Sequence, residues 1–461
     1  MRSLRDPDRL LGEGLAAIRA QFRIPEGFPP AVLAAAAAAA AKVPEAHTDR
    51  TALLFVTLDP ARSTDLDQAF AIERAGSDLL LHYAIADVAW FVAGGDPLDT
   101  EAWARGETLY LPDGKAGLYP PALAEGAASL LPDGPRPAVV LTTRVAPDGA
   151  VKLESAERAL IRSRAKLAYE TVTPAELPEG FAELAERITA AETARGAARV
   201  DPPEQEVERG GDGRYALSFR PLLDAERQNA AMSLATNMAV ADALQAAATG
   251  LFRVMAAPDD FALRRLRHTA RAFGLDWAEA QTLEAFERGL EPADPRHAAF
   301  MLAIRRAGRG ASYAPYRSGI VPWHDAMTAT YAHATAPLRR LADRYVLQAV
   351  LAVANGEPVP PQVEAAFERV PAVMAKAEAR SGQVERAVID LAETALLAGR
   401  EGEHFDALVT DLGENGARIQ LCDVPVVARV DAHRVVPGDR IRVRLDAADP
   451  VSRTLRFARV A

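Results

Sequence analysis

Three aspartates near the start of the chain have the residue type and spacing for metal chemistry. Asp59 closes a strand-like run, and Asp65 and Asp67 follow it two positions apart. In extended backbone, side chains two positions apart point to the same side. Carboxylates brought together stay ionised at neutral pH only with a hard cation between them, and such oxygen ligands suit Mg²⁺ or Mn²⁺. The segment therefore indicates a divalent-metal site of the kind used in phosphoryl chemistry.

Simpler interpretations of the same acids remain open. Each aspartate can instead cap a helix or hold an Asx turn, and a calcium loop fits poorly because its turn glycine and distal glutamate are missing. The spacing of the histidines does not indicate a zinc site, so we expect core or interface roles for them: His82, His324 and His333. We expect Asp87 and Asp343 to be structural carboxylates, each holding a basic neighbour.

Two longer motifs stand far apart in the chain. The first is Thr57–Asp67, followed by Tyr83–Val88, and the second is Tyr331–Asp343. Together they resemble the ribonuclease II/ribonuclease R (RNB) family of Mg²⁺-dependent 3′→5′ hydrolytic exoribonucleases, over roughly residues 50–395. The resemblance implies degradation of RNA to nucleoside 5′-monophosphates. It also implies Mg²⁺ as cofactor, with Mn²⁺ as the alternative ion and no organic cofactor.

The resemblance assigns roles at the metal site. Asp59, Asp65 and Asp67 match the family's metal-site aspartates, and we take Asp65 and Asp67 as catalytic. Gln68 stands where the family usually has a further aspartate. Its amide can offer Mg²⁺ a neutral oxygen but no charge, so a second metal should bind more weakly or be held largely by the RNA phosphate. Arg339 matches the family's catalytic arginine, whose guanidinium can clamp two phosphate oxygens as charge builds during in-line attack.

Other matched residues are expected to contact RNA. Tyr110 and Tyr169 match tyrosines that hold the last nucleotides, and aromatic stacking tolerates any base; core tyrosines are the alternative. Arg340 is assigned to RNA binding, although it could instead be the arginine that points into the site. A plain surface arginine pair is the remaining interpretation. The family also places a glutamate near the terminal ribose, where this chain has Asn229. Asn229 would do a weaker version of that job, which puts sugar discrimination in question.

Hydrophobic patterning predicts the elements that must position these residues. Residues 49–398 are expected to form an α+β catalytic domain of the RNB type, strand-rich first and helix-rich later. Strands are predicted at 52–58, 79–86, 138–145 and 151–161, with a hairpin turn at Pro147–Gly149 joining the last two. Helices are predicted at 175–198, 224–248, 259–273, 277–289, 293–308, 334–353 and 361–399.

Two smaller regions flank this domain. Residues 1–48 predict a helical N-terminal cap, either a helix-turn-helix-like unit or a helical pair packed on the next domain. Residues 401–461 hold five short strand-like runs, the number in an OB-fold, and we expect an RNA-binding domain there. Many family members carry two cold-shock domains first, and too few residues precede Thr51 for them. Their absence would widen the entrance to structured as well as single-stranded RNA.

Composition excludes several classes of protein. The 461 residues are 49% hydrophobic and carry a net charge of −10, so the chain is globular, and an RNA partner must bind in a local basic groove. Cys422 is the only cysteine, which excludes a disulfide framework and cysteine-based metal sites and fits the reducing cytoplasm. The longest apolar run, Ala31–Ala41, is too short for a span of about 20 residues. We expect no membrane partner and a monomer.

Two other function classes stay open beside the exoribonuclease. One is a catalytically impaired RNA-binding protein on an exoribonuclease scaffold, motivated by Gln68 and the missing glutamate. The other is a metal-dependent phosphoesterase for small nucleotides. The OB-like tail argues against the second, because a small substrate needs no grip on a strand.

Overall fold

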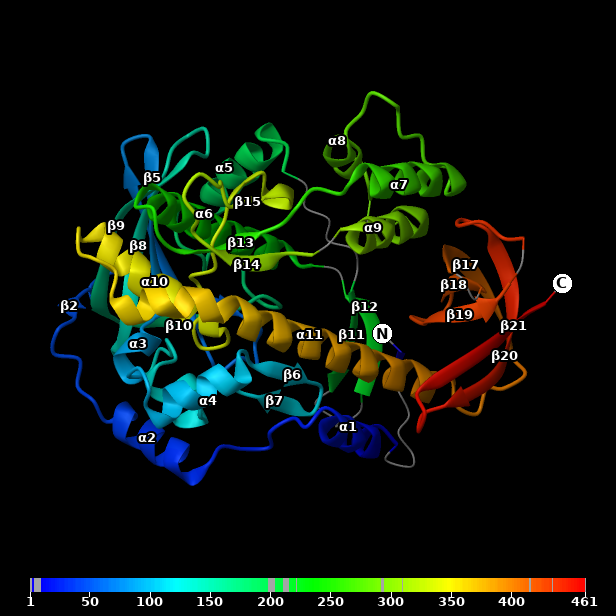
Figure 1. Ribbon diagram of the computed structural model, residues 1–461, viewed down its shortest axis with the longest axis horizontal. Coiled ribbons are helices and arrows are strands. Elements are labelled where there is room, and N and C mark those ends of the chain that lie inside the picture. The colour runs from blue at the N-terminus through cyan, green and yellow to red at the C-terminus, as the bar shows by residue number, and fades with distance from the viewer. Residues whose placement is uncertain are drawn as a thin grey trace.

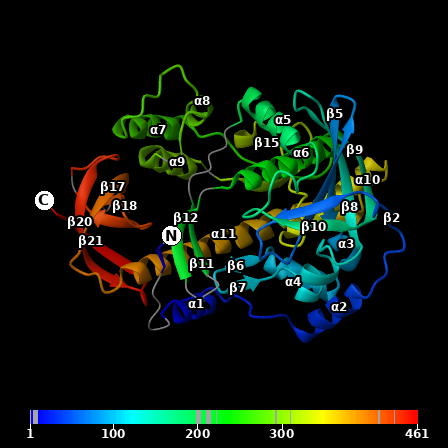
Figure 2. The same cartoon turned by 180° about the vertical axis from the view of Figure 1, so that it is seen from behind.

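One long helix, α11 (Pro361–Leu397), runs from a large α+β domain to a C-terminal β-barrel, as both views show (Figures 1 and 2). The computed structural model describes residues 2–3, 10–197, 204–209, 215–220, 222–291, 294–308, 310–413, 416–432 and 434–460. The expected fold class, α+β with a five-stranded tail domain, is confirmed. In these residues no helix combines the length and apolar character needed to cross a membrane.

A seven-stranded mixed sheet forms the centre of the large domain. Its strand order is β10-β3-β4-β5-β8-β9-β2, with parallel pairs only at the two ends. The strands are β2 (Thr48–Asp49), β3 (Phe55–Asp59), β4 (Gln68–Ala75), β5 (Asp78–Ala86), β8 (Arg136–Val145), β9 (Val151–Ile161) and β10 (Ser163–Ala168). The predicted hairpin of β8 and β9 is confirmed. The patterning missed β4, because charged residues interrupt its short apolar stretch.

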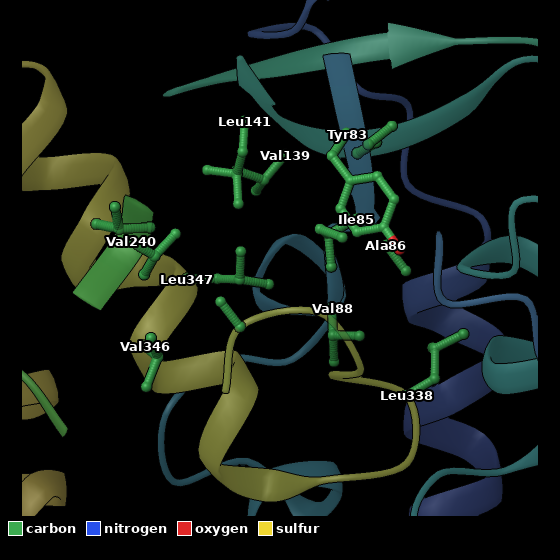
Figure 3. Packing of buried hydrophobic residues seen from close by; sticks show 14 of the residues in the cluster. Tyr83, Ile85, Ala86, Val88, Val139, Leu141, Val240, Leu338, Val346 and Leu347 are labelled. Atoms are coloured by element: carbon green, nitrogen blue, oxygen red, sulfur yellow. The ribbon is translucent and has the colours of Figure 1, made fainter. Parts of the chain in front are cut away.

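Two helices cover this sheet and close the main core. α6 (Asp224–Ala246) contacts β5, β8 and β9, and α10 (Leu341–Ala354) contacts β9 and α6. Figure 3 shows Ile85, Val139 and Leu141 of the strands facing Val240 of α6 and Leu347 of α10. All five side chains are buried, and each such burial contributes about 1.5–3 kcal/mol. The functional segments before β4 and before α10 therefore sit on a rigid support.

Three predicted helices are shorter than expected, and one of them is α5, which covers Phe181–Ala194 of the predicted 175–198. α10 begins at Leu341 rather than 334, because the N–H groups of Ala336 and Leu338 donate to side-chain carboxylates of Asp343 and Asp67. Pro337, which has no N–H, also disfavours helix before it. The prediction over 277–289 was likewise too long. Arg267 binds the carbonyls of residues 278, 279 and 281, and α8 covers only Leu283–Glu287. The other helices here are α7 (Asp260–Ala272) and α9 (Pro295–Ala307).

The N-terminal helices pack on the large domain separately. α1 (Leu10–Gln21) lies against α11, whereas α2 (Pro30–Ala40) lies against α3 (Val88–Phe91) and α4 (Pro97–Arg105). The helix-turn-helix alternative is therefore wrong, since each helix buries its apolar face on a different part of the domain.

Several short elements complete the large domain. They are β1 (Arg2–Ser3), β11 (Glu204–Arg209) and β12 (Tyr215–Arg220) in one sheet, the pairs β6 (Leu109–Leu111) with β7 (Gly114–Ala116), β13 (Leu251–Val254) with β14 (Ser312–Pro315), and β15 (Trp323–His324) with β16 (Ala329–Thr330), and the single turns η1 (Leu123–Ala127) and η2 (Asp325–Met327).

The C-terminal domain is a closed barrel with its own apolar core. Its order is β17-β18-β19-β21-β20, from β17 (His404–Gly413), β18 (Gly416–Leu421), β19 (Val427–Asp431), β20 (Arg440–Asp449) and β21 (Thr454–Val460). Leu397 at the end of α11 joins that core. One turn earlier, the buried carboxylate of Glu393 accepts hydrogen bonds from the Val427 N–H (2.7 Å) and from Gln205 Nε2 of β11 (2.6 Å). Glu393 thus ties helix, barrel and β11 together.

Burial raises the pKa of Glu393 to about 7. The folded protein therefore holds a proton that the unfolded chain releases near its ordinary pKa, and stability falls as pH rises from about 4.5 to 7. We expect Glu393→Gln, which keeps the accepting oxygen, to remove about 1–3 kcal/mol of this pH dependence. Urea unfolding of wild type and variant across pH 4.5–8 measures it. Parallel pH curves for the two proteins would contradict the assignment.

Candidate active site

The buried carboxylate of Asp67 joins the two motifs. Asp67 lies just before β4 and is 5% exposed. Its Oδ1 accepts a hydrogen bond from the Leu338 N–H at 2.7 Å, and its Oδ2 lies 3.4 Å from Nε of Arg339. The Asp67 side chain therefore positions both the Leu338 backbone, 271 positions further along the chain, and the neighbouring Arg339 guanidinium.

Further polar contacts clamp the same loop. Gln68 Nε2 donates to the Thr335 carbonyl at 2.8 Å. From α6, Asn237 Oδ1 accepts the Ala334 N–H at 2.9 Å, and Ser233 Oγ lies 2.9 Å from Thr335 Oγ1. A satisfied buried network of this kind holds a unique geometry. The loop before α10 is therefore rigid although it has no regular structure.

The adjacent arginines have different surroundings. Arg339 is 43% exposed in its side chain and lies beside Asp67. Arg340 donates from Nε and Nη2 to the carboxylate of Asp343, at 3.0 and 2.8 Å, and Asp343 is fully buried. Arg339 therefore faces the site, while Arg340 is engaged in a structural pair that does not favour RNA binding. Asp343 holds a basic neighbour as expected, and so does Asp87, 3.2 Å from Arg158.

The aspartates share one electrostatic environment. Burial raises the pKa of Asp67 to about 8 and that of Asp59 to about 6. The positive charge of Arg339 opposes both shifts, and the negative charge of Asp65 adds to both. Asp65 is thus near enough to repel the charge of each of the other two, and burial rather than this repulsion is what leaves their pKa values raised. Such a site favours a bound cation.

Asp59 and Asp67 both offer carboxylate oxygens, the donor type that a divalent ion takes. In the described part of the chain, no three acidic, histidine or cysteine side chains are grouped closely enough to enclose an ion by themselves. Mg²⁺ commonly takes one or two carboxylates and completes its shell with water and phosphate oxygens. The expected Gln68 contact has little support, because the Gln68 carbonyl oxygen already accepts the buried Tyr83 hydroxyl.

A small hairpin brings two further side chains to Asp65. Tyr110 and Lys115 are cross-strand partners on β6 and β7. The Tyr110 hydroxyl donates to Asp65 Oδ2 at 3.0 Å, and Lys115 Nζ lies 2.7 Å from Oδ1. Tyr110 is 55% exposed, which leaves ring surface for a base. Sequence reasoning missed Lys115, although the turn Pro112–Gly114 signals a hairpin that pairs it with Tyr110.

Tyr169 lies beside Asp59 on the other side of the site. The Tyr169 N–H donates to the Asp59 carbonyl at 3.2 Å. Asn229 of α6 donates from Nδ2 to the Tyr169 hydroxyl at 2.7 Å and to the Leu58 carbonyl at 3.3 Å. Asn229 therefore orients Tyr169. The nearest acid on this helix, Glu226, is held by Arg220 and the Leu223 N–H.

Two of the three histidines have hydrogen-bond partners, and the His324 ring packs edge-on against Tyr331, with 5.7 Å between ring centroids. His82 contacts Thr142 Oγ1 (3.1 Å) and Glu73 (3.0 Å). His333 Nδ1 lies 2.8 Å from the Tyr313 hydroxyl, and burial lowers the pKa of the His333 ring. Within the described residues none of them joins a group of metal ligands.

A basic cleft of about 620 Å³ opens between α9, α11 and the barrel. Its lining contributes several guanidinium groups, from Arg305, Arg306, Arg386, Arg418, Arg429 and Arg453. Burial lowers the pKa of Arg418, and the charges of Arg306, Arg429 and Arg386 lower it further. These arginines outnumber the acids of the lining, Glu385, Asp390 and Glu393, so the cleft concentrates positive charge in an acidic protein.

Comparison with protein families identifies both domains. Residues 47–356 match the RNB domain, and residues 403–460 match the RNase II-type exonuclease C-terminal S1 domain. The chain is 26% identical to ribonuclease R of Aquifex aeolicus, over 95% of this chain and 69% of that protein. It is 30% identical to exoribonuclease 2 of Salmonella typhimurium, over 83% of this chain and 62% of that protein. The chain thus spans about two thirds of these relatives.

Solved structures share the fold. Mycoplasma genitalium RNase R in complex with ribose methylated single-stranded RNA superposes with a TM-score of 0.87 at 19% identity, covering 100% of this chain and 79% of that one. Yeast Ssd1, a pseudonuclease, gives a TM-score of 0.68 at 16% identity, covering 96% and 57%. The fold therefore does not decide activity, and the site must.

The pair of Arg340 and Asp343 offers a test of the loop's support. Asp343→Ala leaves a shielded guanidinium without its carboxylate, so we expect a loss of about 3 kcal/mol in unfolding free energy. Replacing both partners with apolar residues, Arg340→Met with Asp343→Leu, should recover the part that comes from the unpaired guanidinium, whereas the Ala336 N–H stays without its acceptor. Glu368→Ala, which breaks the exposed pair with Arg317, is the control and should change stability by under about 1 kcal/mol. Urea unfolding decides; an Asp343→Ala midpoint equal to that of wild type would refute this role.

Proposed function

Because the chain belongs to the RNB family, we propose that it is a metal-dependent 3′→5′ exoribonuclease that releases nucleoside 5′-monophosphates. One observation carries the proposal: the buried Asp67 holds Arg339 against the carboxylate site across two distant motifs. RNase II-type nucleases depend on a divalent metal, and we propose Mg²⁺ at Asp59 and Asp67, with Mn²⁺ as a substitute.

Each side chain then has a defined task. A divalent ion bound there would polarise the scissile phosphate and lower the pKa of a water molecule. Arg339 stabilises the charge that builds on the phosphate oxygens. Tyr110 and Tyr169 hold the last nucleotides so that the phosphate lies in line for attack. Asn229 fixes the Tyr169 hydroxyl near the terminal sugar.

We propose that the arginine cleft and the barrel bind the RNA substrate. The cleft lies where the barrel meets α9 and α11, so a strand bound there contacts both domains. We propose single-stranded RNA as the main substrate, structured RNA as a further one, and a monomeric enzyme of the cytoplasm. The single cysteine fits that compartment.

A second function is favoured by the missing glutamate, where the chain has Asn229, and by Gln68. The Gln68 amide carries no charge, and both of its ends are bonded within the protein. An RNA-binding protein on an inactive exoribonuclease scaffold has this feature as well. The same experiment separates the two functions.

We expect the wild-type protein to shorten 5′-labelled single-stranded RNA from its 3′ end with Mg²⁺ or Mn²⁺, and to be inactive with EDTA. Asp67→Asn should lower the rate by about 10³-fold, because it removes the carboxylate that orients Arg339, while RNA binding is retained. Asp148→Asn, at an exposed turn, is the matched control. A time course with matched DNA in parallel also measures sugar discrimination.

Two results would contradict this function. RNA binding without shortening in either metal would identify an RNA-binding protein. Full activity of Asp67→Asn would show that the chemistry lies elsewhere.

The arginine cleft makes a separate prediction. Arg418→Gln with Arg429→Gln should weaken binding of single-stranded RNA about tenfold and lower the slope of log affinity against log salt by about 1–2. Fluorescence anisotropy at several salt concentrations, with Asp67→Asn as the background to prevent cleavage, measures both quantities. Arg317→Gln, at an exposed position, is the control. An unchanged salt slope would remove the cleft from the RNA path.

A further inference from the structure

Arg339 Nε lies 3.4 Å from Asp67 Oδ2, whereas a cation lies closer, within hydrogen-bonding distance, to the carboxylate of Asp65. Lys115 Nζ lies 2.7 Å from Oδ1, and the Tyr110 hydroxyl donates to Oδ2 at 3.0 Å. The direct register of Tyr110 and Lys115 on β6 and β7 puts both side chains on one face of the hairpin. The ammonium is therefore presented by a paired strand and not by a free loop.

A second carboxylate holds the same ammonium. Glu125 Oε1 lies 3.3 Å from Lys115 Nζ, and Glu125 Oε2 accepts the Thr64 hydroxyl at 2.8 Å. The Lys115 side chain is 22% exposed. Lys115 thus lies between Asp65 and Glu125. Tyr110 of the hairpin holds Asp65, and Thr64 holds Glu125.

The charge of the site is divided unequally as a result. Asp59 and Asp67 share the half-exposed Arg339. Asp65 has a close, fixed ammonium, and Gln68, which carries no charge, is bonded at both ends to Thr335 and Tyr83. A divalent ion at Asp65 would have to displace that ammonium. If the ammonium stayed, the two cations would repel each other at contact distance.

We propose that Lys115 takes the place of a second divalent ion at Asp65, so that the protein binds one ion, at Asp59 and Asp67. The consequence for catalysis rests on the proposed function: Lys115 would supply a fixed positive charge beside the phosphate. The proposal does not rest on catalysis for its test. Lys115 is a positioning residue here, acting through Asp65.

Metal stoichiometry tests the proposal directly. Mn²⁺ titration followed by electron paramagnetic resonance counts bound ions without RNA or turnover. We expect Lys115→Met to bind one Mn²⁺ more than wild type, because it frees the carboxylates of Asp65 and Glu125 together. Lys115→Arg, which keeps the charge, should bind the wild-type number. Adding Asp65→Asn to Lys115→Met should remove the extra ion.

Controls separate this test from folding and from the proposed function. Lys152→Met, at a side chain 77% exposed, should leave the number of bound ions unchanged, and Lys115→Gln provides a second neutral variant should Lys115→Met fold poorly. Equal ion numbers in wild type and both neutral variants, zero included, would overturn the proposal. RNA degradation with such equal numbers would refute Lys115's role alone, whereas an extra ion without RNA degradation would refute only the exoribonuclease.

Discussion

The buried carboxylate of Asp67 is the contact on which the site depends. It accepts the Leu338 N–H and faces Arg339, so it joins the segment before β4 to the loop before α10. Burial disfavours the ionised form of Asp67. The loop before α10 opposes this effect, because Arg339 supplies a positive charge and Leu338 donates a hydrogen bond. Asn237 and Ser233 of α6 hold the same loop from the side of the core. The packing of the core therefore also fixes the geometry of the site.

The aspartates of the site and the arginines of the cleft lie in different parts of the structure. In a chain of net charge −10, three aspartates lie at the site and six arginines line the cleft beside the barrel. The two regions suit different parts of one polyanionic substrate, since phosphate contacts along a strand need spread positive charge and phosphoryl chemistry needs clustered carboxylates. α11 connects them, with one end in the large domain and Leu397 in the barrel core.

Gln68 departs from the family pattern, and Lys115 lies beside Asp65. Gln68 is neutral and internally bonded, and Lys115 neutralises Asp65. Both residues lower the negative charge near Asp65, while the pair of Asp59 and Asp67 keeps its acids. Since the same fold serves enzymes and a pseudonuclease, these side chains carry more information about activity than the architecture does.

The sequence by itself determined the family, the α+β domain and the five-stranded tail, because two long motifs and strand patterning are local features. It also indicated which acids could act, and it marked Gln68 as a departure. Only the tertiary structure decided between Arg339 and Arg340, since their difference is a choice of partner, Asp67 or Asp343. The same reason explains the false helix over 334–340: its alanines favour helix locally, but its N–H groups bond to carboxylates outside the helical ladder. Lys115 likewise gains meaning only when the hairpin brings it to Asp65, because contacts between distant segments are not encoded in the spacing of either one.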